Sequence, residues 1–274
     1  MKIKFKVLIP IIVIFCLLLI AFDCRLKTVE YTIDSSKIDN EVKIALIADL
    51  HSCYYGKEQK SIISRIREYD PDIVLIAGDF FDDKLSDKNA KIIIKKLSNS
   101  YKLYYVSGNH EWWSGRMYEM FDFLDSADVT VLRGDCDKIN INGQGLNICG
   151  IDDPEVSNYD SQYPDWKQQL SSAAGNISKN SFNILLAHRP ENHKLYFDHD
   201  FELVLSGHAH GGQWRIPGLL NGLCAPNQGF FPKFAGGLYE FENKNMIVSR
   251  GLSRESTRIP RIFNRPELVF VRVK

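Results

Sequence analysis

The sequence predicts an α/β protein with two packed sheets and helices on their outer faces. In the first half of the chain, short apolar runs typical of buried strands alternate with segments of helical periodicity. In the second half, short strand-like segments follow one another across glycine-containing turns. No second domain boundary is visible, and 274 residues are enough for one large domain with a buried core.

The first half contains strands and helices in alternation. The strands are expected at residues 42–48, 72–77 and 103–106, and the helices at residues 57–69, 86–97 and 116–124. In the first of these helices, Ile62, Ile63 and Ile66 recur at the spacing of one helical face. Such alternation favours a parallel sheet with right-handed crossovers.

The second half contains mostly predicted strands, which suggests two packed sheets. They are expected at residues 129–132, 138–141, 146–149, 183–187, 202–205, 237–242, 246–249 and 268–273. Each of these segments either alternates between apolar and polar residues or runs apolar, as strands packed on a core do.

The N-terminal region predicts a membrane anchor. Lys2, Lys4 and Lys6 precede an uncharged run over residues 7–22, which has about the length of a short spanning helix. The alternatives are a cleaved signal peptide and a lipid attached to Cys24. Both are disfavoured, because the residues around them make poor processing sites.

The expected organisation follows from this anchor. It comprises an uncleaved signal-anchor at residues 1–22, a polar linker at residues 23–40 and one folded domain at residues 41–274. Basic residues before the apolar run predict a cytoplasmic N-terminus. We therefore expect a single-pass protein of the cell membrane with an extracytoplasmic domain.

The net charge indicates which partners to expect, and the cysteine content indicates whether to expect disulfides. The formal net charge is zero, so no nucleic-acid partner is expected. We also expect a monomer. The six cysteines form no CxxC pair. Cys136 and Cys149 could pair outside the cell, but a domain of this size needs no disulfide, so free thiols are expected.

Five polar motifs directly follow predicted strands or apolar runs. They are Asp49-Leu50-His51, Gly78-Asp79-Phe80-Phe81-Asp82, Gly108-Asn109-His110-Glu111, His188, and Gly207-His208-Ala209-His210. Each alone could be surface polarity or a turn. Together, at the carboxyl ends of strands, they would converge on one crevice. Aspartate and asparagine oxygens with histidine nitrogens suit Mn, Fe, Zn or Co, and two such ions can support in-line attack by a hydroxide that they hold.

The set DLH, GDFFD, GNHEWWSG, AHRPE and GHAHGGQ resembles the calcineurin-like metallophosphoesterase family. The resemblance extends from residue 42 to the C-terminus. Its GHAHGGQWRIP and final SRGL…RIFNRPEL segments are similar to the bacterial membrane-associated branch that includes UDP-2,3-diacylglucosamine hydrolase-like enzymes. The resemblance implies a four-layered αββα sandwich.

The resemblance also implies roles for individual residues. One metal would be held by Asp49, His51, Asp79 and His210, and the other by Asp79, Asn109, His188 and His208. Two divalent transition-metal ions are expected, with Mn favoured. His110 would face the substrate phosphate and assist the leaving group. Asp82 would orient His110 or its neighbourhood.

Four further residues are candidates for substrate binding. Trp214 and Phe230 could form an apolar lip for a lipid, or could simply pack a loop. Arg250 and Arg254 could grip an anionic headgroup, or could belong to a solvated basic surface. The expected substrate is a phosphodiester or pyrophosphate, which could be lipid-linked. The alternatives are a broad cell-surface phosphatase or nucleotidase and, less favoured, a non-catalytic binding scaffold.

Overall fold

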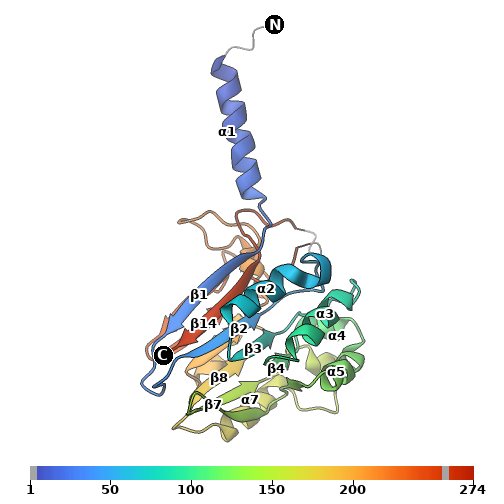
Figure 1. The fold of residues 1–274 in the computed structure, drawn as a ribbon, viewed down its shortest axis with the longest axis vertical. Coiled ribbons are helices and arrows are strands. Elements are labelled where there is room, and N and C mark those ends of the chain that lie inside the picture. Colours follow the sequence, from blue (N-terminus) through green and yellow to red (C-terminus); the bar gives the residue numbers. More distant parts are fainter. Residues whose placement is uncertain (1–4, 255–258) are drawn as a thin grey trace.

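Two six-stranded mixed sheets form the centre of the protein, and helices cover their outer faces (Figure 1). The computed structural model describes residues 5–254 and 259–274. The apolar core between the sheets includes Leu46, Leu75, Ile184 and Leu205, all fully buried. The predicted αββα arrangement is therefore confirmed.

The first sheet holds the alternating first half of the chain together with the C-terminal strand. Its order is β1 (Lys27–Ile33), β14 (Glu267–Val273), β2 (Val42–Ile47), β3 (Ile73–Ala77), β4 (Lys102–Val106) and β5 (Val129–Val131). Strands β2, β3 and β4 run parallel, as predicted, and β5, from the second half of the chain, extends them in parallel. Strand β14, also from the second half, runs antiparallel to β2. Its helical segments are η1 (Lys57–Gln59), α2 (Lys60–Tyr69), α3 (Lys88–Leu97), α4 (Asn109–Trp113) and α5 (Met117–Ser126). Ile62, Ile63 and Ile66 of α2 are buried, as their spacing predicts.

The second sheet is built from the second half of the chain. Its order is β12 (Gly237–Phe241), β13 (Lys244–Val248), β9 (Leu203–Ser206), β8 (Phe182–Leu186), β7 (Gln144–Gly150) and β6 (Cys136–Ile141). Its helical segments are α6 (Val156–Tyr159), α7 (Trp166–Asn176), η2 (Pro190–Asn192), α8 (His193–Phe197) and η3 (His210–Gly212). A small antiparallel pair, β10 (Cys224–Ala225) and β11 (Gly229–Phe230), lies in the loops after η3.

The region predicted as a linker, residues 23–40, contains a strand instead. Within it, β1 pairs in parallel with β14 at the edge of the first sheet. The prediction was wrong because an edge strand can be polar, and here most of its residues are exposed or half-buried. Its signal was the alternation of Val29, Tyr31 and Ile33.

The N-terminal apolar run forms α1 (Phe5–Ala21), a helix of 17 residues that projects away from the sheets (Figure 1). In the described part of the chain, we find no helix with both the length and the apolar character needed to cross a membrane. Lys2 and Lys4, on which the orientation prediction rests, lie outside the described residues. At its C-terminal end α1 meets the domain, where the backbone N–H of Phe263 donates a 2.7 Å hydrogen bond to the Ala21 carbonyl.

Cys136 and Cys149 form a disulfide, contrary to the expectation of free thiols. Strands β6 and β7 make an antiparallel hairpin whose register places the two cysteines directly opposite each other. Their Cα atoms are 4.0 Å apart. The sequence shows only their separation of 13 residues, not the register that brings them together.

Candidate metal centre

The predicted site residues follow the carboxyl ends of strands from both sheets. Asp49 and His51 follow β2, Asp79 follows β3, and Asn109 and His110 begin α4 after β4. From the second sheet, His188 follows β8, and His208 and His210 follow β9. Apart from His110, which is half-buried, these side chains are buried. Loops at the carboxyl ends of strands commonly form the ligand crevice of α/β proteins.

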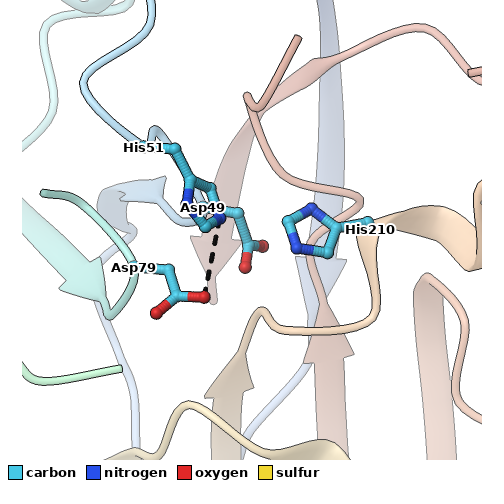
Figure 2. Close-up of side chains that lie close together, drawn as sticks. All are labelled: Asp49, His51, Asp79 and His210. Carbon is cyan, nitrogen blue, oxygen red and sulfur yellow. Dashed lines mark ion pairs between the residues drawn. The ribbon is translucent and has the colours of Figure 1, made fainter. Parts of the chain in front are cut away.

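The structure gathers six of these eight side chains into two adjoining groups. Asp49, His51, Asp79 and His210 place one potential ligand atom each within 4.8 Å of one another, and Asp79, His188 and His208 do the same. Figure 2 shows the first group, with the His51–Asp79 ion pair dashed. The distance from Asp79 Oδ2 is 3.5 Å to His51 Nε2 and 3.2 Å to His188 Nε2. One carboxylate oxygen therefore faces both groups.

Several buried polar atoms of the predicted site residues lack hydrogen-bond partners. Among the described residues, Asp49 Oδ2, His51 Nε2, Asp79 Oδ2 and Asn109 Oδ1 are buried without one. A buried polar atom left unsatisfied costs about 1–3 kcal/mol, so their concentration at one point calls for a ligand. The donor set of carboxylate, amide and imidazole suits divalent transition metals. The buried cluster fits a binuclear divalent metal site.

In each of the four clustered histidines, one ring nitrogen lies within hydrogen-bond distance of an oxygen atom of another residue. His51 Nδ1 lies 3.1 Å from Asp82 Oδ2, His188 Nδ1 2.8 Å from the Ala77 carbonyl, His208 Nε2 2.8 Å from Asn227 Oδ1, and His210 Nδ1 2.8 Å from Ser253 Oγ. Such contacts set the ring orientation and tautomer of metal-binding histidines. Asn227 and Ser253 were not predicted, because each is distant in sequence from the histidine that it contacts.

The electrostatics of the cluster favour a bound cation. Burial opposes protonation of His188, but the neighbouring Asp79 carboxylate outweighs it and raises the His188 pKa to about 10. Burial and the charge on His188 together lower the pKa of His208 to about 3. Burial raises the pKa of Asp49. A cation bound in the cluster would supply the positive charge that the Asp79 carboxylate otherwise draws from His188.

The backbone of the cluster is unusual. Left-handed φ values occur at Asp49 (49°), His51 (47°), Asp79 (47°), His208 (67°) and His210 (48°). Residues with a Cβ rarely adopt this conformation, and such strain concentrates at functional sites. Crowding also explains a glycine of the motifs: a Cβ at Gly108 would lie 2.3 Å from Asp79 Oδ1.

Glu111 holds the turn that carries Asp79, a role that sequence reasoning missed. Its carboxylate is fully buried and accepts backbone hydrogen bonds from Asp79, Phe80, Phe81 and Gly108, at 2.7–3.0 Å. Burial and the charge of Asp79 raise the Glu111 pKa to about 7. The glutamate thus ties two of the motif loops together.

His110 lies at the open side of the cluster. Its side chain is 23% exposed, and its Nδ1 lies 2.7 Å from Asp83 Oδ1. The predicted partner, Asp82, lies 3.9 Å away and instead contacts His51. Asp82 is therefore in the predicted neighbourhood, but the adjacent carboxylate Asp83 takes the position beside His110. Sequence alone could not distinguish two consecutive aspartates.

The structure does not gather the four predicted substrate-binding residues around the cluster. Arg250 is largely buried and donates a 2.8 Å hydrogen bond to Glu267. The Arg254 guanidinium lies over the Tyr55 ring, 4.4 Å from its centroid. Trp214 and Phe230 are exposed on the loops after η3.

Comparison with known proteins agrees with this geometry. Residues 42–212 match the model of the calcineurin-like phosphoesterase family. An uncharacterized metallophosphoesterase of Helicobacter pylori (strain 26695) is 33% identical over 193 residues, which cover 69% of this chain and 50% of the relative. The chain thus spans about half the length of that relative. The Bacillus subtilis metallophosphoesterase YkuE is 29% identical over 259 residues, 91% of this chain and 86% of that protein.

Solved structures share the fold at low sequence identity. The Haemophilus influenzae NAD nucleotidase superposes with a TM-score of 0.57 at 16% identity, covering 78% of this chain and 46% of that chain. A dimetal phosphatase from Danio rerio superposes with a TM-score of 0.50 at 13% identity, covering 77% and 88%. From its motifs, its buried ligand cluster and the family match, the chain belongs to the calcineurin-like phosphoesterase family.

Proposed function

We propose that this hydrolase cleaves a phosphodiester or pyrophosphate, including lipid-linked ones, at two divalent ions that share Asp79. The observation that carries the proposal is the position of Asp79 Oδ2, which is buried, without a hydrogen bond and part of both ligand groups. A bridging carboxylate keeps two cations close while offsetting their repulsion. Asp49, His51 and His210 would complete one site, and Asn109, His188 and His208 the other.

The bound ions would supply an activated water and neutralise the charge that develops on the phosphate. The protein would supply position and one proton. Because Asp83 lies against Nδ1 of His110, Nε2 is left to face the substrate and to donate a proton to the leaving oxygen. Trp113, whose ring lies 4.9 Å from that of His110, would form a wall of the cleft.

The proposed ions are Mn, with Fe, Zn and Co as alternatives. The proposed ligand set combines oxygens from two aspartates and Asn109 with four imidazoles. Mn accepts this mixture, and the mixture excludes none of the other three metals. Metal content after expression in defined medium, followed by reloading of stripped protein, distinguishes them.

We further propose that α1 attaches the protein to the cell membrane, with the domain on the extracytoplasmic side. Large apolar side chains of α1 face solvent around the helix, including Ile9 (58%), Phe15 (60%), Leu19 (60%) and Ile20 (60%). Water is an unfavourable environment for such a helix. The Cys136–Cys149 disulfide supports export, because disulfides persist in oxidising compartments.

The test is hydrolysis by the purified, Mn-loaded full chain. A phosphomonoester, a phosphodiester, a nucleoside diphosphate ester and a UDP-linked lipid are compared by kcat/KM. We expect kcat/KM to be higher for the phosphodiester or the pyrophosphate than for the phosphomonoester, and highest for the substrate that carries a lipid. Preference for simple monoesters or nucleotides would instead support the broad cell-surface phosphatase or nucleotidase. The Haemophilus influenzae neighbour is named an NAD nucleotidase.

A further inference from the structure

A cluster of exposed apolar side chains lies on the loops between η3 and β12. We call it the apolar loop patch, and its members are Trp214 (41% exposed), Ile216 (50%), Leu219 (82%), Phe230 (74%) and Phe231 (69%). Single exposed apolar residues are ordinary, but a contiguous group marks a surface that contacts something other than water.

Backbone hydrogen bonds hold the patch together. The N–H of Leu223 donates to the Trp214 carbonyl, and the N–H of Phe231 donates to the Leu223 carbonyl, both at 2.8 Å. Ile216 and Leu220 close a short turn between them. The exposed rings therefore belong to one folded unit.

The same unit joins the base of α1. Trp214 forms a parallel bridge with Ile262, and the next residue, Phe263, donates its N–H to the last residue of α1, Ala21. Phe22, immediately after α1, is 48% exposed. Figure 1 shows the orange loops gathered around the lower end of α1, whereas α7 lies at the opposite end of the domain.

The charged side chains within the loops that carry the patch are basic. From residue 203 to residue 239, the charged side chains are Arg215 and Lys233, with no acidic residue between them or beside them. Arg25 and Arg265 follow at the base of α1, with side chains 83% and 37% exposed, although Asp23 pairs with both. A basic residue near an anionic membrane surface contributes about 1 kcal/mol of attraction.

The patch also borders the metal centre. Its loop begins directly after His210, and Asn227, between the patch residues, contacts Nε2 of His208 at 2.8 Å. A surface that bound the patch would therefore lie beside the mouth of the ligand cluster.

We propose that the apolar loop patch inserts into the headgroup region of an anionic phospholipid bilayer beside α1 and turns the metal centre toward the membrane surface. The inference rests on the proposed attachment through α1 but not on the identity of the substrate. Apolar rings, flanking cations and continuity with an exposed apolar helix all match one occupant, the lipid interface.

The experiment uses the full chain in vesicles of phosphatidylcholine and phosphatidylglycerol whose acyl chains carry bromine. Bromine quenches tryptophans that reach the bilayer, so quenching is compared between Trp214→Phe, the control Trp166→Phe in α7, and the wild type. Trp214→Phe should lose most of the quenching, and Trp166→Phe should retain it. The Phe230→Ser/Phe231→Ser double variant should lose quenching of Trp214, while the matched change at exposed Tyr159 of α6, Tyr159→Ser, should not.

Flotation of the same vesicles separates the two proposals. If every variant floats but Trp214→Phe is quenched as strongly as Trp166→Phe, α1 attaches the protein and the patch proposal is wrong. If the wild type does not float, both the attachment and the patch contact are wrong. If quenching is absent and the double variant lowers the particle mass in detergent, the patch binds a second copy of the chain instead.

Discussion

Removing the Glu111 carboxylate should destabilise the protein more than any exposed substitution. In Glu111→Ala, four buried backbone N–H groups, those of Asp79, Phe80, Phe81 and Gly108, lose their acceptor. Each unsatisfied donor costs about 1–3 kcal/mol, and water entering the cavity can satisfy some of them. We expect a loss of about 4 kcal/mol or more, against a total stability of about 5–15 kcal/mol for a typical domain.

The assay is urea unfolding of the metal-loaded protein, followed by circular dichroism, with metal content measured in parallel. Glu111→Gln is the matched variant. In this variant the amide oxygen still accepts from two of the four backbone N–H groups, whereas the amide NH₂ faces the other two. We therefore expect about half the loss of stability of Glu111→Ala. Both variants should hold less metal, because the turn that carries Asp79 loses its support. A Glu111→Ala protein within about 1 kcal/mol of the wild type would refute this account of the turn.

Three further outcomes are expected. His110→Ala should keep its metals but slow turnover by about 10²–10⁴-fold, with a larger loss for poor leaving groups than for nitrophenolate; equal losses would count against a proton donor. Asp83→Asn should slow turnover in the same way but to a smaller extent, with its metal retained, because Asp83 contacts His110. Asp82→Asn should chiefly weaken metal binding, because Asp82 contacts His51. The reverse pattern would mean that Asp82, as expected from the sequence, orients His110. Cys136→Ser should lower the free energy of unfolding by about 2–4 kcal/mol when compared with the oxidised wild type, and no change on reduction would mean that the disulfide contributes nothing.

The strands and the motif residues could be predicted because their signals are local. Apolar runs such as residues 73–77 are too short and too β-branched for helices, and a polar residue that ends such a run must lie at an edge of the sheet. The histidines and aspartates among these polar residues are then recognisable as candidate metal ligands, because their side chains offer nitrogen and oxygen donors. For these reasons the predicted strands from residue 42 onward and the clustered residues agree with the structure.

What escaped prediction depends on register and on contacts distant in sequence. Asn227 and Ser253 reach their histidines only after the loops have folded, and nothing in their own surroundings marks them. The disulfide depends on the hairpin register of β6 and β7. Helix α7 was not predicted, although Asp165 and Gln168 form a capping box at its N-terminus, which is a local signal.

Metal stoichiometry tests most directly whether two ions share the carboxylate of Asp79. The purified full chain and its Asp79→Ala variant would be reloaded with Mn, dialysed and analysed for bound metal per chain, with hydrolysis measured on the same samples. We predict about two ions per wild-type chain, as expected for a binuclear site. The variant should lose metal from both sites and lose hydrolysis with it. A variant that still holds two ions and turns over at a near-normal rate would show that Asp79 does not bridge two catalytic ions.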